Sequence, residues 1–121
     1  MENLAPHIFR QRAVVEAIYG ESIEPTCLFL KMFIGQISKL LGMTLLFGPH
    51  VMRHAEKIDP KYAGFEAQAI WCESGISLYT WEDVRFMSID LYSCKPFSID
   101  DAVRFTQNYF QTSKIVFRNN A

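Results

Sequence analysis

The sequence has few cysteines, no long apolar run and no block of charges of one sign. Its three cysteines, Cys27, Cys72 and Cys94, are too few and too scattered for a disulfide framework or a zinc site. The apolar runs are far too short to span a bilayer, and the first residues predict no secretory signal. A net charge of −1 without a charged block predicts no nucleic-acid or membrane partner. We therefore expect a cytoplasmic protein that binds no metal.

The chain does have enough apolar residues for one compact core. Half of its 121 residues are hydrophobic and 14% are aromatic, which suits a packed, folded chain. No linker, internal repeat or low-complexity segment divides the sequence. We therefore expect a single domain that spans residues 1–121.

The patterns along the chain predict the order strand, helix, several antiparallel strands, helix, strand. Strands are expected at 12–19, 43–47, 65–72, 76–81, 85–94 and 113–117. The first helix is expected to start at Ser22–Pro25, with the proline in its first turn, and to stop before Gly42. The second helix follows a capping box at Ser98–Asp101, and the second half of 48–64 is expected to be an irregular loop. This order predicts an α+β fold, a two-layer sandwich with an antiparallel sheet and helices packed on one face.

Periodicity also predicts which side chains form the core. The expected core positions are Leu28, Met32, Ile37 and Leu41 in the first helix, Ala102, Phe105 and Tyr109 in the second, and Phe65, Ala67, Ala69, Trp71, Met87, Ile89 and Leu91 in the strands. The opposite strand faces carry Glu66, Gln68, Ile70, Cys72, Ser74, Ser88, Asp90, Tyr92 and Cys94. A polar face that no helix covers is either solvated, an interface or a functional site.

The segment CESGISLYTWEDVRFMSIDLYSC, from Cys72 to Cys94, resembles the bacterial and archaeal S-adenosylmethionine decarboxylase family. The family pattern is close to ESHISIHTWPE, followed after a short gap by AAVDLFTCG. Glu73 and Ser74 match the self-cleavage site, and Cys94 follows Ser74 at the family's spacing. Further matches in register are Ile76, Ser77, Thr80, Trp81, Glu82, Ile89, Asp90, Leu91 and Ser93. Upstream, RAVVEAIYG and LLGMTLL look like the family's first strand and its turn into the second strand.

This resemblance implies a pyruvoyl enzyme. In the family, the serine hydroxyl attacks the carbonyl of the preceding glutamate, and β-elimination from the resulting ester cuts the chain and leaves a pyruvoyl group, the electron sink for decarboxylation. Carried over, Ser74 would be the pyruvoyl precursor, Glu73 would end the first fragment, and Cys94 would be the general acid. For Cys94, an inert structural thiol is the alternative. The implied substrate is S-adenosylmethionine, for polyamine (spermidine) synthesis.

The sequence departs from the family pattern at the groups that move protons. Tyr79 stands where the family has a histidine, and Glu66 where it usually has a serine that assists processing. Gly75 replaces the histidine that follows the cleaved serine. A histidine is largely unprotonated at pH 7, whereas an ordinary tyrosine is ionised only about once in a thousand. Glu66 is one substitute base, and His50 or His54 is another if the loop that carries them folds over the site.

Different classes of function therefore remain open. The first is an active pyruvoyl-dependent decarboxylase, acting on S-adenosylmethionine or on an amino acid such as arginine or ornithine. The second is a processing-deficient relative that binds S-adenosylmethionine or regulates a partner decarboxylase. Cleavage of another bond of S-adenosylmethionine, without pyruvoyl, is a third.

Two further expectations concern binding and assembly. A sulfonium cation and an adenine ring need aromatic faces, for which Tyr79, Tyr92 and Trp81 are the candidates. Burying the uncovered sheet face against a second copy would give a C2 homodimer with sites at or near the interface, as the resemblance also implies.

Overall fold

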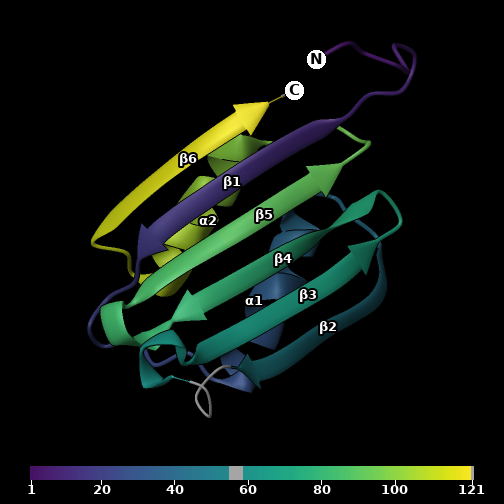
Figure 1. Ribbon diagram of the computed structural model, residues 1–121. Coiled ribbons are helices and arrows are strands. Elements are labelled where there is room, and N and C mark those ends of the chain that lie inside the picture. Colours follow the sequence, from purple (N-terminus) through teal and green to yellow (C-terminus); the bar gives the residue numbers. More distant parts are fainter. Residues whose placement is uncertain (55–58, 121) are drawn as a thin grey trace.

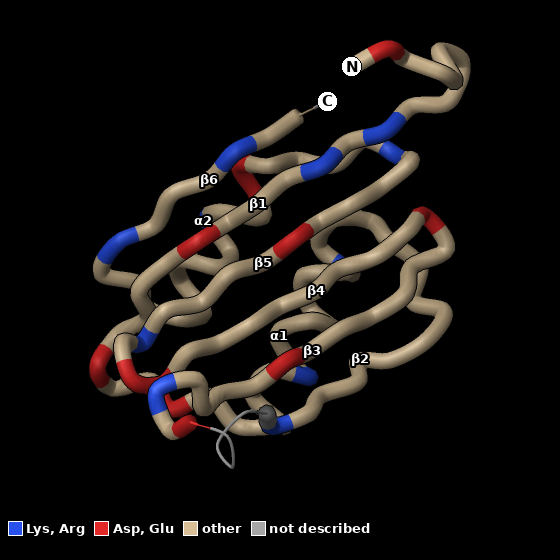
Figure 2. Tube along the Cα trace, viewed as in Figure 1, with Lys and Arg blue, Asp and Glu red and all other residues tan. Residues whose placement is uncertain are grey.

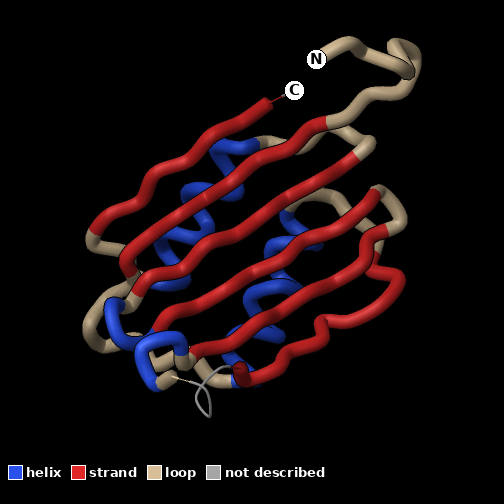
Figure 3. The backbone as a smooth tube through the Cα atoms, in the orientation of Figure 1, coloured by secondary structure: helices blue, strands red, loops and turns tan. Residues whose placement is uncertain are grey.

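The computed structural model describes residues 1–54 and 59–120, and within them six strands form one sheet. The elements are β1 (Gln11–Ile18), α1 (Cys27–Leu40), β2 (Leu45–His54), β3 (Gly64–Trp71), β4 (Ser74–Trp81), β5 (Phe86–Ser93), α2 (Ile99–Phe110) and β6 (Lys114–Asn120), with short 3-10 helices at Pro60–Tyr62 and Glu82–Val84. The strand order is β2-β3-β4-β5-β1-β6, and every neighbouring pair is antiparallel. Both helices lie on the same face of the sheet (Figures 1 and 3). The predicted α+β two-layer sandwich is therefore confirmed.

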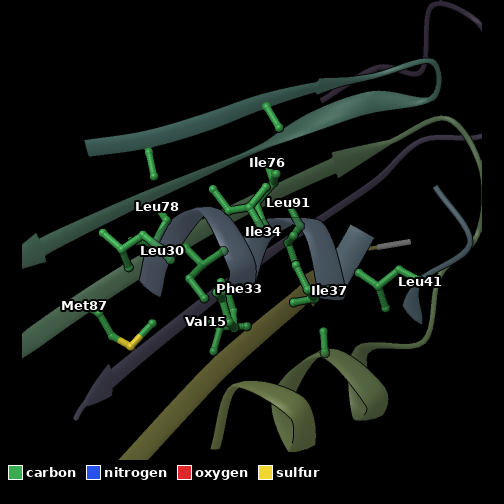
Figure 4. Packing of buried hydrophobic residues seen from close by; sticks show 14 of the residues in the cluster. Val15, Leu30, Phe33, Ile34, Ile37, Leu41, Ile76, Leu78, Met87 and Leu91 are labelled. Atoms are coloured by element: carbon green, nitrogen blue, oxygen red, sulfur yellow. The ribbon is translucent and has the colours of Figure 1, made fainter. Parts of the chain in front are cut away.

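The core fills the space between the sheet and the two helices. Strand side chains alternate between faces, so every second residue is buried against the helices. The buried strand residues include Val15, Ala67, Ala69, Trp71, Ile76, Leu78, Met87, Ile89 and Leu91. Leu30, Ile34 and Ile37 of α1 point from the helix toward the sheet (Figure 4). The predicted core positions of β5, and those of β3 from Ala67 to Trp71, are confirmed.

α1 begins later than the sequence predicts. The N-cap is Thr26, whose Oγ1 accepts a hydrogen bond from the backbone N–H of Phe29 at 3.1 Å. Pro25 therefore precedes the helix instead of lying in its first turn, and the predicted start was wrong. Gly42 follows the C-cap with φ of 74°, which confirms the predicted stop.

α1 also turns a different face toward the sheet. The predicted core residues Leu28 and Met32 are 66% and 49% exposed, whereas Ile37 and Leu41 are buried as predicted. The helix carries two apolar stripes, and the sheet buries the one that holds Leu30, Phe33, Ile34 and Ile37. Phe33 stacks on Phe105 of α2 with ring centroids 5.5 Å apart, so this stripe also joins the two helices.

β2 is longer than predicted and contains both His50 and His54. The prediction was a strand at 43–47, yet β2 runs to His54, with register breaks between Leu45 and His50, where Gly48 and Pro49 lie. A Gly-Pro pair usually ends a strand, but β2 is at the edge of the sheet, where a bulge accommodates a proline. His50 is exposed and pairs with Gln68 of β3. Residues 55–58 of the expected loop lie outside the described residues.

Candidate active site

The matched cleavage site lies in a two-residue hairpin turn. Trp71 ends β3 and pairs with Ser74 at the start of β4, so Cys72 and Glu73 form the turn between them. Ser74 has a φ of 137°, a backbone conformation that residues other than glycine rarely adopt. Such a residue stores roughly 1–3 kcal/mol of strain. The backbone is therefore strained at the serine that matches the family's cleaved residue.

The carbonyl group of Glu73 is held by the residue that follows β5. The backbone N–H of Cys94, the residue after β5, donates a hydrogen bond to the Glu73 carbonyl oxygen at 2.9 Å. A donor in this position stabilises the negative charge that develops on the oxygen when a nucleophile attacks the carbonyl carbon. The held carbonyl and the Ser74 hydroxyl belong to the two sides of one peptide bond. The side chain of Cys94 is exposed.

The side chain of Glu73 ties the same turn to the residue before β2. Its carboxylate accepts hydrogen bonds from the backbone N–H of Thr44 at 2.9 Å and from the Thr44 hydroxyl at 3.4 Å. The N–H of Cys72 donates to the carbonyl oxygen of Thr44 at 2.8 Å. The backbone donor of Thr44, helped by the charge of Lys95, holds the pKa of the Glu73 carboxyl below its usual value. The turn is therefore fixed on both sides, by Thr44 and by Cys94.

A shallow cavity of about 380 Å³ lies beside Ser74, on the sheet face that the helices leave uncovered. It is lined by Gln68, Ala69, Ile70, Ser74, Gly75, Ile76, Ser77, Asp90 and Tyr92. β4 forms the floor of this cavity, with its small residues Gly75 and Ser77. The walls are the residues paired with them, Ile70 and Gln68 on β3 and Tyr92 and Asp90 on β5. We call this cavity the Gly75 hollow.

The hollow exists because position 75 has no side chain. A Cβ atom at Gly75 would lie 2.8 Å from the backbone carbonyl oxygen of Ala69 on β3, closer than real Cβ contacts come. A side chain there would push two paired strands apart. The family's histidine at this position therefore does not fit the present backbone, and its replacement by glycine shapes the cavity.

Ser74 lines the hollow because of its unusual backbone conformation, and not because strand alternation places it on the polar face. Alternation from Phe65 onward placed Ser74 on the polar face, but the two turn residues shift the register. Ser74 pairs with Trp71 and Ser93, both buried on the helix side. Its unusual φ takes it out of regular strand geometry, and it is half-buried at the edge of the hollow.

Tyr79 and Glu66 lie together but far from the turn. They are directly paired across β4 and β3, and the Glu66 carboxylate accepts a hydrogen bond from the Gln68 amide at 3.3 Å. Tyr79 is five residues beyond Ser74 on the same strand, which corresponds to about 16 Å at the usual rise per residue. The structure thus brings Glu73, Ser74 and Cys94 together, and separates them from this pair within one protomer.

The three aromatic candidates are also divided between two places. Trp81 packs on Phe86 and lies near Tyr79, with ring centroids 5.2 and 6.4 Å apart respectively. Tyr92 lines the hollow, and the guanidinium of Arg12 lies over its ring, 4.1 Å from the centroid. Of the three, only Tyr92 lines the cavity beside Ser74.

Two further residues of the site have little signal in the sequence. Alternation places Asp90 on the polar face, but only strand pairing puts it in the wall of a cavity, opposite Ser77. Thr44 has no recognisable pattern, because its contact with Glu73 joins segments far apart in the chain. The histidines do not lie in a loop: His50 lies on the edge strand β2 and does not line the hollow, and the side chain of His54 is not among those that the structure describes.

Fold and site define a class of protein, a small two-layer α+β chain with a strained, doubly held Glu-Ser turn at the end of an antiparallel sheet. The sequence profile of the S-adenosylmethionine decarboxylase family matches residues 27–120, and the chain belongs to this family. The fold is similar to the crystal structure of the adenosylmethionine decarboxylase from Aquifex aeolicus VF5, with a TM-score of 0.70 and 13% identical residues over 93% of this chain and 89% of that chain. At this identity the likeness shows the fold. A search of curated proteins gives no match. Within the described residues, no helix has the length and apolarity needed to cross a membrane.

Proposed function

We propose that this chain is a decarboxylase of the S-adenosylmethionine type that activates itself by cleaving its Glu73–Ser74 bond. The observation that carries the proposal is the hydrogen bond from the Cys94 N–H to the Glu73 carbonyl oxygen, next to the strained Ser74. Attack of the Ser74 hydroxyl on that carbonyl would turn the amide into an ester and pass the hydroxyl proton to the freed nitrogen. The Cys94 N–H would hold the charge that develops on the oxygen.

Cleavage then needs removal of a proton from the α-carbon of Ser74. The electron pair of that C–H bond expels the Glu73 carboxylate, and water replaces the nitrogen of residue 74, which leaves as ammonia. The products are the fragments 1–73 and 74–121. The base for this step is where this chain differs from the family pattern. Tyr79 stands in place of the family's histidine, and Glu66 in place of its serine.

The residues around Ser74 fit a pyruvoyl group at that position. The preceding carbonyl is held for attack, and the residue itself lies at the edge of a cavity open to substrate. When formed, this group supplies the electron sink that decarboxylation of an α-amino acid requires. The Cys94 thiol, exposed at the same turn, is our candidate for the acid that returns a proton to the substrate carbon.

A homodimer would complete the site. The uncovered sheet face exposes the apolar side chains Phe47, Met52, Ile70 and Val116. Burying this face against a second copy would remove apolar area from water. A C2 axis that crosses the middle of β4 at a right angle would reverse the partner's β4, and so would bring the Tyr79–Glu66 pair of one protomer toward Ser74 of the other. We therefore propose a C2 homodimer that binds S-adenosylmethionine at its interface.

The replacements at positions 79 and 66 favour a second candidate function. A chain with Tyr79 and Glu66 in place of the family's histidine and serine could remain uncut and serve as a binding protein for S-adenosylmethionine, or as a regulatory partner of an active decarboxylase. The Gly75 hollow would then be its binding site. Arginine or ornithine is the alternative substrate of an active enzyme, because the same electron sink serves any α-amino acid.

Release of carbon dioxide from carboxyl-labelled S-adenosylmethionine tests the first candidate. We expect release by the native chain and none by Ser74→Ala, while the control Ser113→Ala, an exposed serine before β6, retains it. Binding of S-adenosylmethionine by an uncut chain that releases no carbon dioxide would support the second candidate instead.

A further inference from the structure

We propose that Asp90 binds the side-chain cation of the substrate in the Gly75 hollow, and thereby selects α-amino acids that carry a second positive charge. The inference rests on the proposed function for the role of Ser74 at one end of the hollow. It adds a residue that determines which amino acid is accepted.

The first argument is the position of Asp90 relative to Ser74. Ser74 pairs with Ser93 on β5, and Asp90 is three residues back along that strand, opposite Ser77. At the usual rise this is about 10 Å from the level of Ser74. A substrate whose α-carbon lies at Ser74 would run its side chain along the floor at Gly75 and Ser77 toward Asp90.

The second argument is that the Asp90 carboxylate is unsatisfied by the protein. In the part of the chain that the structure describes, Asp90 has neither a hydrogen-bond nor an ion-pair partner. The cation on the neighbouring strand, Arg12, lies over the Tyr92 ring instead. The charge of Asp90 is therefore available to a ligand in the hollow, and its side chain is exposed to that space.

The third argument is that the hollow places acceptor oxygens between apolar walls. The Gln68 amide donates one of its two N–H groups to Glu66, at 3.3 Å, and its carbonyl oxygen accepts no hydrogen bond from the described residues. Acidic positions lie on β1, β3 and β5 across the sheet (Figure 2). Ile70 and Tyr92 add apolar walls on either side of the floor. Acceptors and a carboxylate between apolar walls suit an aliphatic chain that ends in a positive charge.

Two kinds of substrate carry this chemistry, and matched ligands distinguish them. The sulfonium of S-adenosylmethionine is one source of the cation, and its neutral counterpart is S-adenosylhomocysteine. The guanidinium of arginine is the other, and its neutral counterpart is citrulline. The two ligands of each pair differ at the charged group and share the rest of their framework. Comparing their affinities therefore shows whether Asp90 recognises the charge.

The test is titration calorimetry of the full-length chain with all four ligands, with KM in place of Kd for any ligand that is turned over. We expect Asp90→Asn to weaken binding of one of the two cationic ligands by about 10-fold or more and to leave its neutral counterpart unchanged. Whichever cation responds identifies the substrate class. The control Glu24→Gln removes the same charge from an exposed loop before α1 and should change no affinity.

Three results would overturn the inference. They are an equal loss for both members of a pair, no loss for either cation, and no binding of either cation to the native chain at millimolar concentration. The intact mass of the same samples reports separately on cleavage at Ser74. A chain that cleaves and releases carbon dioxide but fails the Asp90 test keeps the proposed function and loses this inference.

Discussion

The backbone N–H of Cys94 lies 2.9 Å from the carbonyl oxygen of Glu73, so the end of β5 holds the peptide bond between Glu73 and Ser74. In the proposed function Cys94 acts twice, through its backbone on cleavage and through its thiol on the substrate. The two roles are separable by mutation because alanine keeps the N–H and proline removes it.

Two variants of Cys94 should accordingly behave in opposite ways. Cys94→Ala should still cleave but should lose decarboxylation, since it lacks the thiol that returns the proton. Cys94→Pro should cleave more slowly, by roughly 10²–10³-fold, the usual effect of deleting one donor to a developing oxyanion. Mass spectrometry follows cleavage and labelled carbon dioxide follows decarboxylation. Equal cleavage rates for the two variants would contradict the backbone role.

Restoring a histidine at position 79 should accelerate cleavage. A histidine offers an unprotonated base at pH 7 far more often than an ordinary tyrosine does, by a factor that corresponds to about 4 kcal/mol. We expect Tyr79→His to cleave faster than the native chain by up to that limit, and Glu66→Ser to add to the gain. Phe86→His, on the same sheet face but outside the family position, is the control. Identical rates in the native chain and Tyr79→His would place the base elsewhere.

The close approach at Gly75 predicts a stability difference between two glycine substitutions. Gly75→Ala places a Cβ atom against the Ala69 carbonyl oxygen and should lower the free energy of unfolding by about 1–3 kcal/mol. Gly35→Ala, in the interior of α1, where the new Cβ would meet nothing within 4 Å beyond its chain neighbours and the backbone of its own helix, should raise it by up to about 1 kcal/mol. Denaturant titration measures both, and a neutral Gly75→Ala would show that β3 and β4 separate freely.

The proposed homodimer predicts a difference between two equally exposed apolar residues. Phe47 pairs with Ile70 on the uncovered sheet face and is 61% exposed, while Leu28 on the outer face of α1 is 66% exposed. Phe47→Glu should convert a dimer into a monomer because it places a charge in the buried face. Leu28→Glu should remain dimeric. Light scattering at micromolar concentration distinguishes these states, and a monomeric native chain would contradict the proposal.

Sequence patterns predict the fold well where one face of an element is buried and the other is wet. β5 shows this, since Met87, Ile89 and Leu91 alternate with polar residues and a shift of one position would bury Asp90. They fail for α1, because Leu28 and Met32 form a second apolar stripe, and only the packing of the folded chain decides which stripe is buried. They fail again for β2, whose Gly-Pro pair is tolerated because the strand lies at an edge.

The site divides in the same way. The chemistry proposed for Ser74 comes from a motif, since the serine must adjoin the carbonyl that it would attack. The Thr44 contact and the wall position of Asp90 depend on which strands are neighbours and in which register, and one sequence does not contain that information. The strain at Ser74 is likewise a property of the folded turn, in which the glycine stands one residue later, at Gly75.

The central claim is that the chain cuts itself between Glu73 and Ser74, and intact-protein mass tests it most directly. After incubation of the purified native chain, we expect fragments 1–73 and 74–121, the second lacking its amino nitrogen, and we expect neither fragment from Ser74→Ala. A single species at 14.0 kDa, from the native chain and from Tyr79→His alike, would contradict the account and leave the uncut binding protein as the better description.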